Sequence, residues 1–250
     1  MISDPQGTVM ALFLAFCRIG GCMMTMPTFS SARMPMQIRL FLSLSMSIAL
    51  LPLFWDILYP RATGDMVVYV MLIFSETLTG VMFGLIAHLY TMGIQFAGTV
   101  IGMSIAFNSQ PTSDPLDDSS QSHLTTLMTF GALLVLFATD FHHIVIKALA
   151  DSYEALPIGR LIDPQQMLIS LTDTMSATFI IMLRLASPFL LFGLLFNVVV
   201  GLINKLAPQI PLYFISTPYA LVGGLLLLYF AIAALLDQFA QAFAPIFNNL

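Results

Sequence analysis

The sequence contains very few charged residues. Only 8% of its 250 residues are charged, with 8 Lys and Arg and 13 Asp and Glu, whereas 58% are hydrophobic. A soluble domain carries roughly 25% charged residues, so this composition excludes a soluble enzyme. A disordered chain is excluded as well, because it would need low hydrophobicity. The net charge of −5 and the absence of a basic stripe exclude a nucleic-acid binder.

Cysteines and catalytic motifs are also scarce. Cys17 and Cys22 lie in one apolar run, where thiols usually pack as small hydrophobic groups, so no disulfide framework is expected. The sequence has no G-x-S-x-G, H-E-x-x-H or Walker loop. The adjacent His142 and His143 have no Cys or carboxylate at zinc spacing. We therefore expect no enzymatic activity, no metal site and no cofactor.

Long apolar runs occupy most of the chain. A helix needs roughly 20 apolar residues to cross a bilayer. The first, second and fourth runs each fit one helix. The other three are too long for one span, so they form either tight hairpins or tall helices that pack on other helices beyond the lipid. The runs lie at about 8–28, 38–59, 66–106, 124–150, 167–203 and 212–247.

Proline and glycine positions favour breaks in these runs. Gly93 lies midway in the third run and Pro188 interrupts the fifth, which favours hairpins over tall helices there. Pro208 and Pro211 separate the last two runs, and proline both lacks an N–H donor and restricts the preceding residue. The C-terminal quarter is therefore predicted to be a helix, a Pro-bounded turn and a second helix. We expect an all-α chain of membrane-associated helical hairpins.

Two glycine motifs occur in the third run. Gly80 and Gly84 form one small-xxx-small motif, and Gly98 and Gly102 form another. This spacing lets a second backbone approach a helix closely. The four glycines are therefore predicted to lie at helix–helix contacts.

Several charged residues lie within or near the apolar runs. Such residues are costly in lipid and usually face protein or water. They either belong to a proton or substrate pathway, or they pair between subunits or lie outside the hydrocarbon. The residues are Arg18, Glu76, Asp140, Asp173, Arg184 and Asp237.

The longest polar stretch is 107–123. It contains Pro, Ser and Asp but no Lys or Arg, and these residues favour turns over helix. It is either an ordinary extramembrane loop or a segment that lines or closes a pathway.

Short motifs along nearly the whole chain resemble those of one known family. In the N-terminal half and the middle they are Arg18, Pro27, Pro35, Arg39, Pro52, Ala97-Gly98, Gly102, Asp114-Pro115, His142-His143, Asp151-Ser152-Tyr153 and the block 156–159. The most specific matches are Ser187-Pro188-Phe189, Leu195-Phe196-Asn197, the block 201–210 and Pro218. Together they resemble the FliR/SctT family of type III secretion export-gate proteins, and the block around Tyr153 looks more flagellar than injectisome-like.

This resemblance implies a non-enzymatic subunit of the flagellar protein export gate, in the bacterial inner membrane and the flagellar basal body. One copy is expected to join FliP-type and FliQ-type proteins and to contact FlhB-type and FlhA-type proteins. Together they would form a helical cone around a channel for unfolded export substrates. Residues 1–175 would form a FliP-like region, and residues 176–250 a FliQ-like C-terminal hairpin. Membrane lipid is an expected partner and nucleic acid is not.

The resemblance also implies roles for individual residues. The loop around the Asp-Pro pair, about 107–122 here, would project into the channel as a plug. Its candidate gating residues are Phe107, Asn108, Gln110, Pro111, Asp114 and Pro115. The candidate assembly and packing residues are Gly80, Gly84, Gly98, Gly102, Pro188, Asn197, Gly201, Pro208, Gln209 and Pro218. Near Gly201 and Gly224 the hairpin is expected to face a FliQ-like partner.

One alternative remains open. The chain could be a small polytopic ion or solute transporter that uses the carboxylates of Glu76, Asp140, Asp173 and Asp237. A transporter of this size would need inverted repeats or broken helices around a midplane site. The sequence shows no internal repeat, and it has no paired catalytic motif of an intramembrane protease either.

Overall fold

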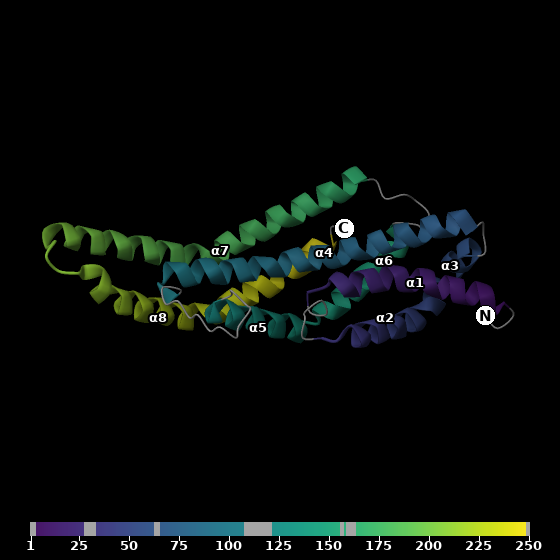
Figure 1. Cartoon of the computed structure of the whole chain (residues 1–250), viewed down its shortest axis with the longest axis horizontal. Coiled ribbons are helices and arrows are strands. Elements are labelled where there is room, and N and C mark those ends of the chain that lie inside the picture. Colours follow the sequence, from purple (N-terminus) through teal and green to yellow (C-terminus); the bar gives the residue numbers. More distant parts are fainter. Residues whose placement is uncertain are drawn as a thin grey trace. The chain divides into compact units, whose positions relative to one another are not determined.

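A computed structural model describes residues 4–27, 34–62, 66–107, 122–155, 158 and 164–248. Within these ranges every regular element is helical, which confirms the predicted all-α fold (Figure 1). The elements are α1 (Pro5–Thr25), α2 (Met36–Leu50), the 3-10 turn η1 (Leu51–Phe54), α3 (Trp55–Ala62), α4 (Met66–Ser104), α5 (His123–Ala138), α6 (Phe141–Ala155), α7 (Pro164–Leu206), α8 (Leu212–Gln241) and α9 (Phe243–Asn248).

Five helices in the described residues are long and apolar enough to cross a membrane. They are α1, the continuous stretch Met36–Ala62, α4, most of α7, and α8. A sixth span is possible if α5 and α6 together count as one. These lengths agree with a membrane protein.

The third and fifth apolar runs are single tall helices, so the expected breaks at Gly93 and Pro188 are wrong. Helix α4 has 39 residues and α7 has 43. Gly93 marks a close approach instead of a break, because a Cβ there would lie 2.5 Å from Cγ2 of Thr178. A glycine tolerated inside a helix for packing looks the same in the sequence as one that ends a helix.

Helix α7 continues through Pro188 because its neighbour replaces the missing donor. Proline has no N–H, so the carbonyl of Arg184, four residues earlier, loses its usual helical partner. The Ser187 hydroxyl donates to that carbonyl at 2.9 Å. Serine side chains often satisfy a backbone group that proline leaves free in a membrane helix.

The fourth apolar run differs from its prediction as a single helix. It contains α5 and α6, separated at Thr139 and Asp140. The Thr139 amide donates to the Val135 carbonyl at 2.9 Å and closes α5. Asp140 then has a φ of 56°, in the left-handed region that Asp tolerates better than most residues. This residue turns the chain out of the helical path.

The Pro-bounded turn near the C-terminus is confirmed. Helix α7 ends at Leu206 and α8 begins at Leu212. The Ala207 amide donates to the Ile203 carbonyl at 2.9 Å, and the Ile210 amide donates to the Ala207 carbonyl at 3.2 Å. The two helices therefore form a hairpin, with the turn drawn in yellow-green in Figure 1.

The chain groups into two compact units. Unit 1 comprises Met1–Tyr90, Phe141–Met175 and Pro245–Leu250, and unit 2 comprises Thr91–Asp140 and Ser176–Ala244. Helices α4 and α7 contribute residues to both. The predicted FliP-like and FliQ-like regions rest on likeness to other proteins, so this spatial grouping does not test that division.

Unit 1 is organised around α1. Asp4 caps this helix by accepting a hydrogen bond from the Gly7 amide at 3.2 Å, and Pro5 supplies the fixed φ that suits a first helical turn. One side of α1 packs against α2 and α3. In the same core the rings of Phe54 and Tyr153 stack with centroids 4.3 Å apart, which joins η1 to α6.

Candidate functional site

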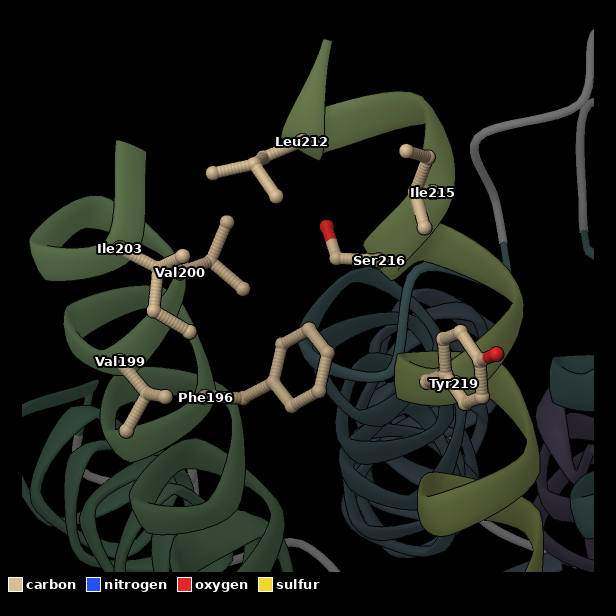
Figure 2. Close-up of a pocket in the computed structure, with 8 residues that line it drawn as sticks. All are labelled: Phe196, Val199, Val200, Ile203, Leu212, Ile215, Ser216 and Tyr219. Carbon is tan, nitrogen blue, oxygen red and sulfur yellow. The ribbon is translucent and has the colours of Figure 1, made fainter. Parts of the chain in front are cut away.

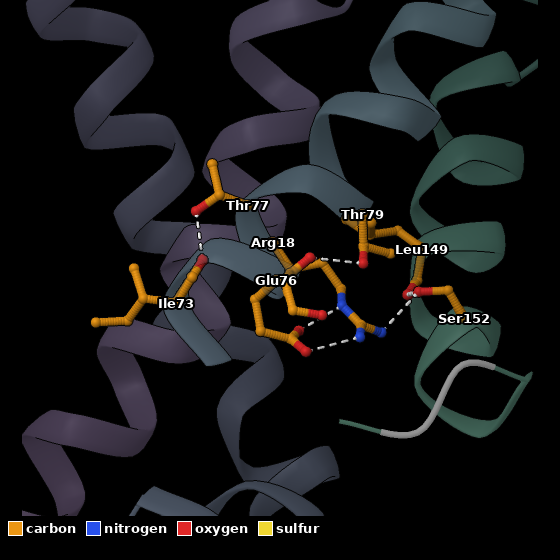
Figure 3. Close-up of polar contacts among 8 residues, drawn as sticks. Arg18, Ile73, Glu76, Thr77, Thr79, Leu149 and Ser152 are labelled. Carbon is orange, nitrogen blue, oxygen red and sulfur yellow. Dashed lines mark hydrogen bonds and ion pairs between the residues drawn. The ribbon is translucent and has the colours of Figure 1, made fainter. Parts of the chain in front are cut away.

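A buried ion pair lies at the centre of unit 1. The Arg18 Nε donates to Glu76 Oε2 at 2.6 Å, and Nη2 donates to Oε1 at 3.1 Å (Figure 3). Both side chains are only 1% exposed. The third arm, Nη1, donates to the Ser152 hydroxyl at 3.1 Å, and Tyr153 places its ring 4.0 Å from the guanidinium carbon. Arg18 of α1 therefore binds both α4 and α6.

This arrangement differs from the alternatives considered for the two charges, which were a pathway, a pair between subunits or a place outside the hydrocarbon. Arg18 and Glu76 pair within the chain, not between subunits. The bidentate geometry is the strongest form of Arg–carboxylate contact. Ser152 completes it, because its hydroxyl accepts from Arg18 and donates to the Leu149 carbonyl at 2.6 Å. A carboxylate held in this way is suited to joining helices and unsuited to exchanging protons with a substrate.

The other three carboxylates of the transporter alternative are exposed. Asp140, Asp173 and Asp237 all lie at the surface of the described structure. Asp237 accepts a hydrogen bond from Gln241, one turn further along α8, at 2.8 Å. This contact lies within one helix and does not join Asp237 to another carboxylate. None of these observations supports an intramembrane carboxylate pathway.

The first glycine motif lies where α4 meets α1. A Cβ built on Gly80 would overlap the backbone carbonyl of Arg18. A Cβ built on Gly84 would overlap the Cys22 carbonyl and the Thr25 hydroxyl. The backbones of α1 and α4 therefore approach so closely at these positions that only glycine fits on α4. This contact lies next to the buried ion pair.

The second glycine motif lies where α4 meets α5 in unit 2. A Cβ on Gly98 would lie 3.1 Å from the Thr125 Cα, and Gly102 is buried. Thr99 Oγ1 and Thr125 Oγ1 lie 3.4 Å apart. These contacts join the two helices that flank the predicted plug segment.

The predicted plug segment lies almost entirely outside the described residues. Of its candidate gating residues only Phe107 is described, and its side chain is partly buried. The other five are Asn108, Gln110, Pro111, Asp114 and Pro115. What the structure does describe is where the segment leaves α4 and where it enters α5.

Both ends of this segment are well defined. Helix α4 ends at Ser104, the Ile105 amide donates to the Ile101 carbonyl at 3.1 Å, and Ala106 has a φ of 60°. On the other side Ser122 caps α5, accepting from the Leu124 amide at 3.3 Å. The segment therefore begins and ends at fixed points of unit 2.

Two glycines, one on α7 and one on α8, pack against the end of α4. The sequence did not predict either contact. A Cβ on Gly193 of α7 would lie 2.7 Å from the Ser104 carbonyl oxygen. A Cβ on Gly224 of α8 would overlap the Ile105 side chain. Gly224 is thus buried against its own chain, and the expectation that residues near it face a FliQ-like partner stays a prediction. Single glycines in long apolar helices were the only indication in the sequence.

The predicted packing residues of the hairpin are at the surface. A Cβ on Gly201 would meet no atom within 4 Å. The Asn197 amide donates to the Gly193 carbonyl at 2.8 Å, so it supports its own helix. The remaining exposed residues of the set are Pro188, Pro208, Gln209 and Pro218.

An apolar cavity lies between α7 and α8 near their turn. Its volume is about 240 Å³. Phe196 points from α7 towards α8, and Tyr219 lies opposite it (Figure 2). The other lining residues are Val199, Val200, Ile203, Leu212, Ile215 and Ser216. The two helices are therefore loosely packed at this end of the hairpin.

The two neighbouring histidines of α6 lie closer together than expected. Neighbouring residues of a helix do not face each other, yet the ring centroids of His142 and His143 lie 4.3 Å apart.

The sequence matches the family described as bacterial export proteins, family 1, over residues 9–246. The chain belongs to this family. It is similar to the flagellar biosynthetic protein FliR of Caulobacter vibrioides, with 29% identity over 220 residues, 86% of this chain and 85% of that protein. It is also similar to the proteins of the same name from Escherichia coli, with 26% identity over 95% of this chain and 90% of that protein, and Bacillus subtilis, with 21% identity over 87% and 84%.

The family match covers the buried pair of Arg18 and Glu76 as well as α7 and α8, which expose many apolar side chains in the single chain.

Proposed function

We propose that this protein is a subunit of the flagellar type III protein export gate and forms part of the channel through which unfolded flagellar subunits leave the cell. The observation that carries the proposal is the family match over 9–246, together with relatives named FliR that align over most of both chains. The role is structural and needs no catalysis. No observation favours the transporter alternative.

Export of flagellar subunits tests this function directly. In cells that lack the protein, hook and filament subunits should remain inside, and the wild-type gene should restore their appearance in the medium. A transporter would affect the uptake or efflux of a solute and leave subunit export unchanged. Unimpaired export in the deletion strain would therefore contradict the proposal.

The hairpin exposes apolar side chains that lipid or a protein partner would cover. Leu206, Phe214 and Phe230 are 86%, 85% and 77% exposed in the single chain. Exposed apolar surface is typical of a protein or membrane contact. We propose FliP-type, FliQ-type, FlhB-type and FlhA-type proteins as the partners of one copy of this chain, in the inner membrane and basal body. Residues 1–175 would be FliP-like and the hairpin 176–250 FliQ-like.

A cysteine placed on this face should identify the neighbour. Leu202 is 60% exposed beside Gly201, so Leu202→Cys should form a disulfide with a cysteine in a FliQ-type partner. Ala220 is 6% exposed in α8, and Ala220→Cys serves as the buried control that should not cross-link. The products are read on a non-reducing gel. A cross-link to a second copy of this chain alone would contradict the single-copy arrangement.

We also propose that the segment 107–122 closes the channel at rest. A conduit wide enough for an unfolded chain would leak ions, so something must fill it when no substrate is present. This stretch is the longest polar one, has no basic residue to hold it at anionic lipid, and starts and ends at fixed points of α4 and α5.

Deletion of residues 108–118 should leave the assembled gate intact and raise its resting permeability to ions and small solutes. Asp114→Ala alone should have a smaller effect, because a plug acts by its bulk and not by one contact. Dye uptake or conductance in cells that make the gate is the measurement. A deleted gate that assembles and stays as tight as the wild type would show that 107–122 is an ordinary surface loop.

A further inference from the structure

We propose that Gly193 and Gly224 position the start of the plug segment by holding the end of α4. We call Ser104, Ile105, Gly193 and Gly224 together the α4-end anchor. This inference rests on the proposed gating role of 107–122. The new element is that Gly193 of α7 and Gly224 of α8, which lie outside the segment, determine where the segment begins.

The first contact is between backbones. A Cβ on Gly193 would lie 2.7 Å from the Ser104 carbonyl oxygen and 3.3 Å from the Ser104 Cβ. Real Cβ atoms do not approach a carbonyl oxygen so closely, and a backbone oxygen cannot rotate away as a side chain can. Any residue other than glycine at position 193 must therefore move α7 or the end of α4.

The second contact holds a side chain. Ile105 is 0% exposed, and a Cβ on Gly224 would overlap both its Cβ and its Cγ2. These atoms lie next to the Ile105 backbone, so a rotamer change cannot remove the overlap. Ile105 is therefore seated directly on the backbone of α8.

The chain changes direction immediately after the anchor. Ala106 has a φ of 60°, a conformation that a non-glycine residue adopts at a cost. Its amide donates to the Met103 carbonyl at 3.3 Å, which ends the helical hydrogen bonding. Ile105 is buried, whereas Phe107, where the proposed plug begins, is only partly buried.

Asn197 stabilises the glycine that the anchor requires. Glycine weakens a helix by roughly 1 kcal/mol relative to Ala. The Asn197 side-chain amide donates to the Gly193 carbonyl at 2.8 Å, one turn along α7. This contact gives the exposed Asn of the Leu-Phe-Asn motif a physical role within its own chain, in support of the anchor.

The test is Gly224→Ala, measured for gate assembly and for resting conductance. The added methyl should displace Ile105 and misplace the plug, so the assembled gate should leak about tenfold more than the wild type, the effect of ~1.4 kcal/mol on a closed–open equilibrium. Gly223→Ala is the matched control on the adjacent residue. A Cβ there meets only the far end of the Phe192 ring at 3.0 Å, which can move aside, so that gate should stay tight.

A reciprocal change separates the anchor from a general weakening of the fold. In the double variant Ile105→Gly with Gly224→Ala, removal of the Ile105 side chain leaves space for the methyl added at position 224. Its gate should be tighter than that of either single variant. If Gly224→Ala does not assemble, the double variant should restore assembly. A double variant that is no better than the single ones in either measurement would overturn the proposal.

The deletion of 108–118, measured in the same assay, distinguishes failure of the anchor from failure of the plug. A leaking deletion beside a tight Gly224→Ala gate would overturn the anchor alone. If the deletion and Gly224→Ala both leave assembled gates as tight as the wild type, the gating role of 107–122 is wrong and the anchor fails with it.

Discussion

Arg18→Ala should prevent the protein from accumulating in the membrane. The substitution leaves Glu76 with no opposing charge at a site where it is 1% exposed, and it removes the donor to Ser152. Removing one partner of a buried ion pair costs about 3–5 kcal/mol, and whole domains are stable by only about 5–15 kcal/mol. The amount of intact chain in the membrane fraction, measured on an immunoblot, should fall severalfold.

Two further variants make this test specific. Arg184→Ala removes an exposed arginine from α7 and should change the amount of protein little. Replacing both partners, Arg18→Met with Glu76→Leu, removes both buried charges and should recover some of the loss. Normal accumulation of Arg18→Ala would mean that the ion pair does not hold α1, α4 and α6 together.

Gly80→Ala should be the most disruptive of the glycine substitutions in unit 1. Its methyl group would overlap the Arg18 carbonyl, so α1 and α4 must separate at the residue that carries the buried guanidinium. Overpacking of this kind costs about 1–3 kcal/mol or more, and the displaced Arg18 also loses contact with Glu76. The midpoint of thermal unfolding in detergent should fall by several degrees.

Gly20→Ala is the matched control, one helix away in the same unit. The nearest atoms to a Cβ on Gly20 belong to the Phe16 ring at 3.7 Å, which is an ordinary contact. Since alanine favours a helix by about 1 kcal/mol over glycine, this variant should be as stable as the wild type or more so. Equal effects of the two substitutions would show that the α1–α4 backbone contact is unimportant.

Composition and the long apolar runs were enough to predict the fold class, and the positions of two prolines predicted the C-terminal hairpin. Two prolines three residues apart remove a donor and restrict the backbone at both ends of one short turn, so no other contact is needed to end α7. Pro188 could not be interpreted in this way. A single proline can lie inside a membrane helix, and here the Ser187 hydroxyl satisfies the Arg184 carbonyl.

The break at Asp140 could not be predicted from the apolar run that contains it. The left-handed φ of 56° depends on one residue, and neither Thr139 nor Asp140 is a strong helix breaker. The backbone conformation at the end of α4 could not be predicted from the sequence either. Alanine rarely adopts a positive φ, so nothing in Ala106 itself predicts a φ of 60°.

The sequence also could not predict which residues pair with the two buried charges. The sequence indicates that Arg18 and Glu76 are costly in lipid, but the alternatives drawn from it were a pathway, pairing between subunits and a place outside the hydrocarbon, and none of them was a pair within the chain. The glycines gave the better indication. Gly80, one helical turn after Glu76, permits the close approach of α1 that brings Arg18 within reach of the carboxylate.

Co-purification tests the central claim most directly. The full-length protein, with a small affinity tag, is extracted in mild detergent from flagellated cells at its native expression level, and the intact complex is weighed by mass spectrometry. The proposal predicts a hetero-oligomer that contains one copy of this chain with several copies of the FliP-type and FliQ-type proteins. Recovery of a folded, monodisperse monomer, or of an oligomer made of this chain alone, would contradict it.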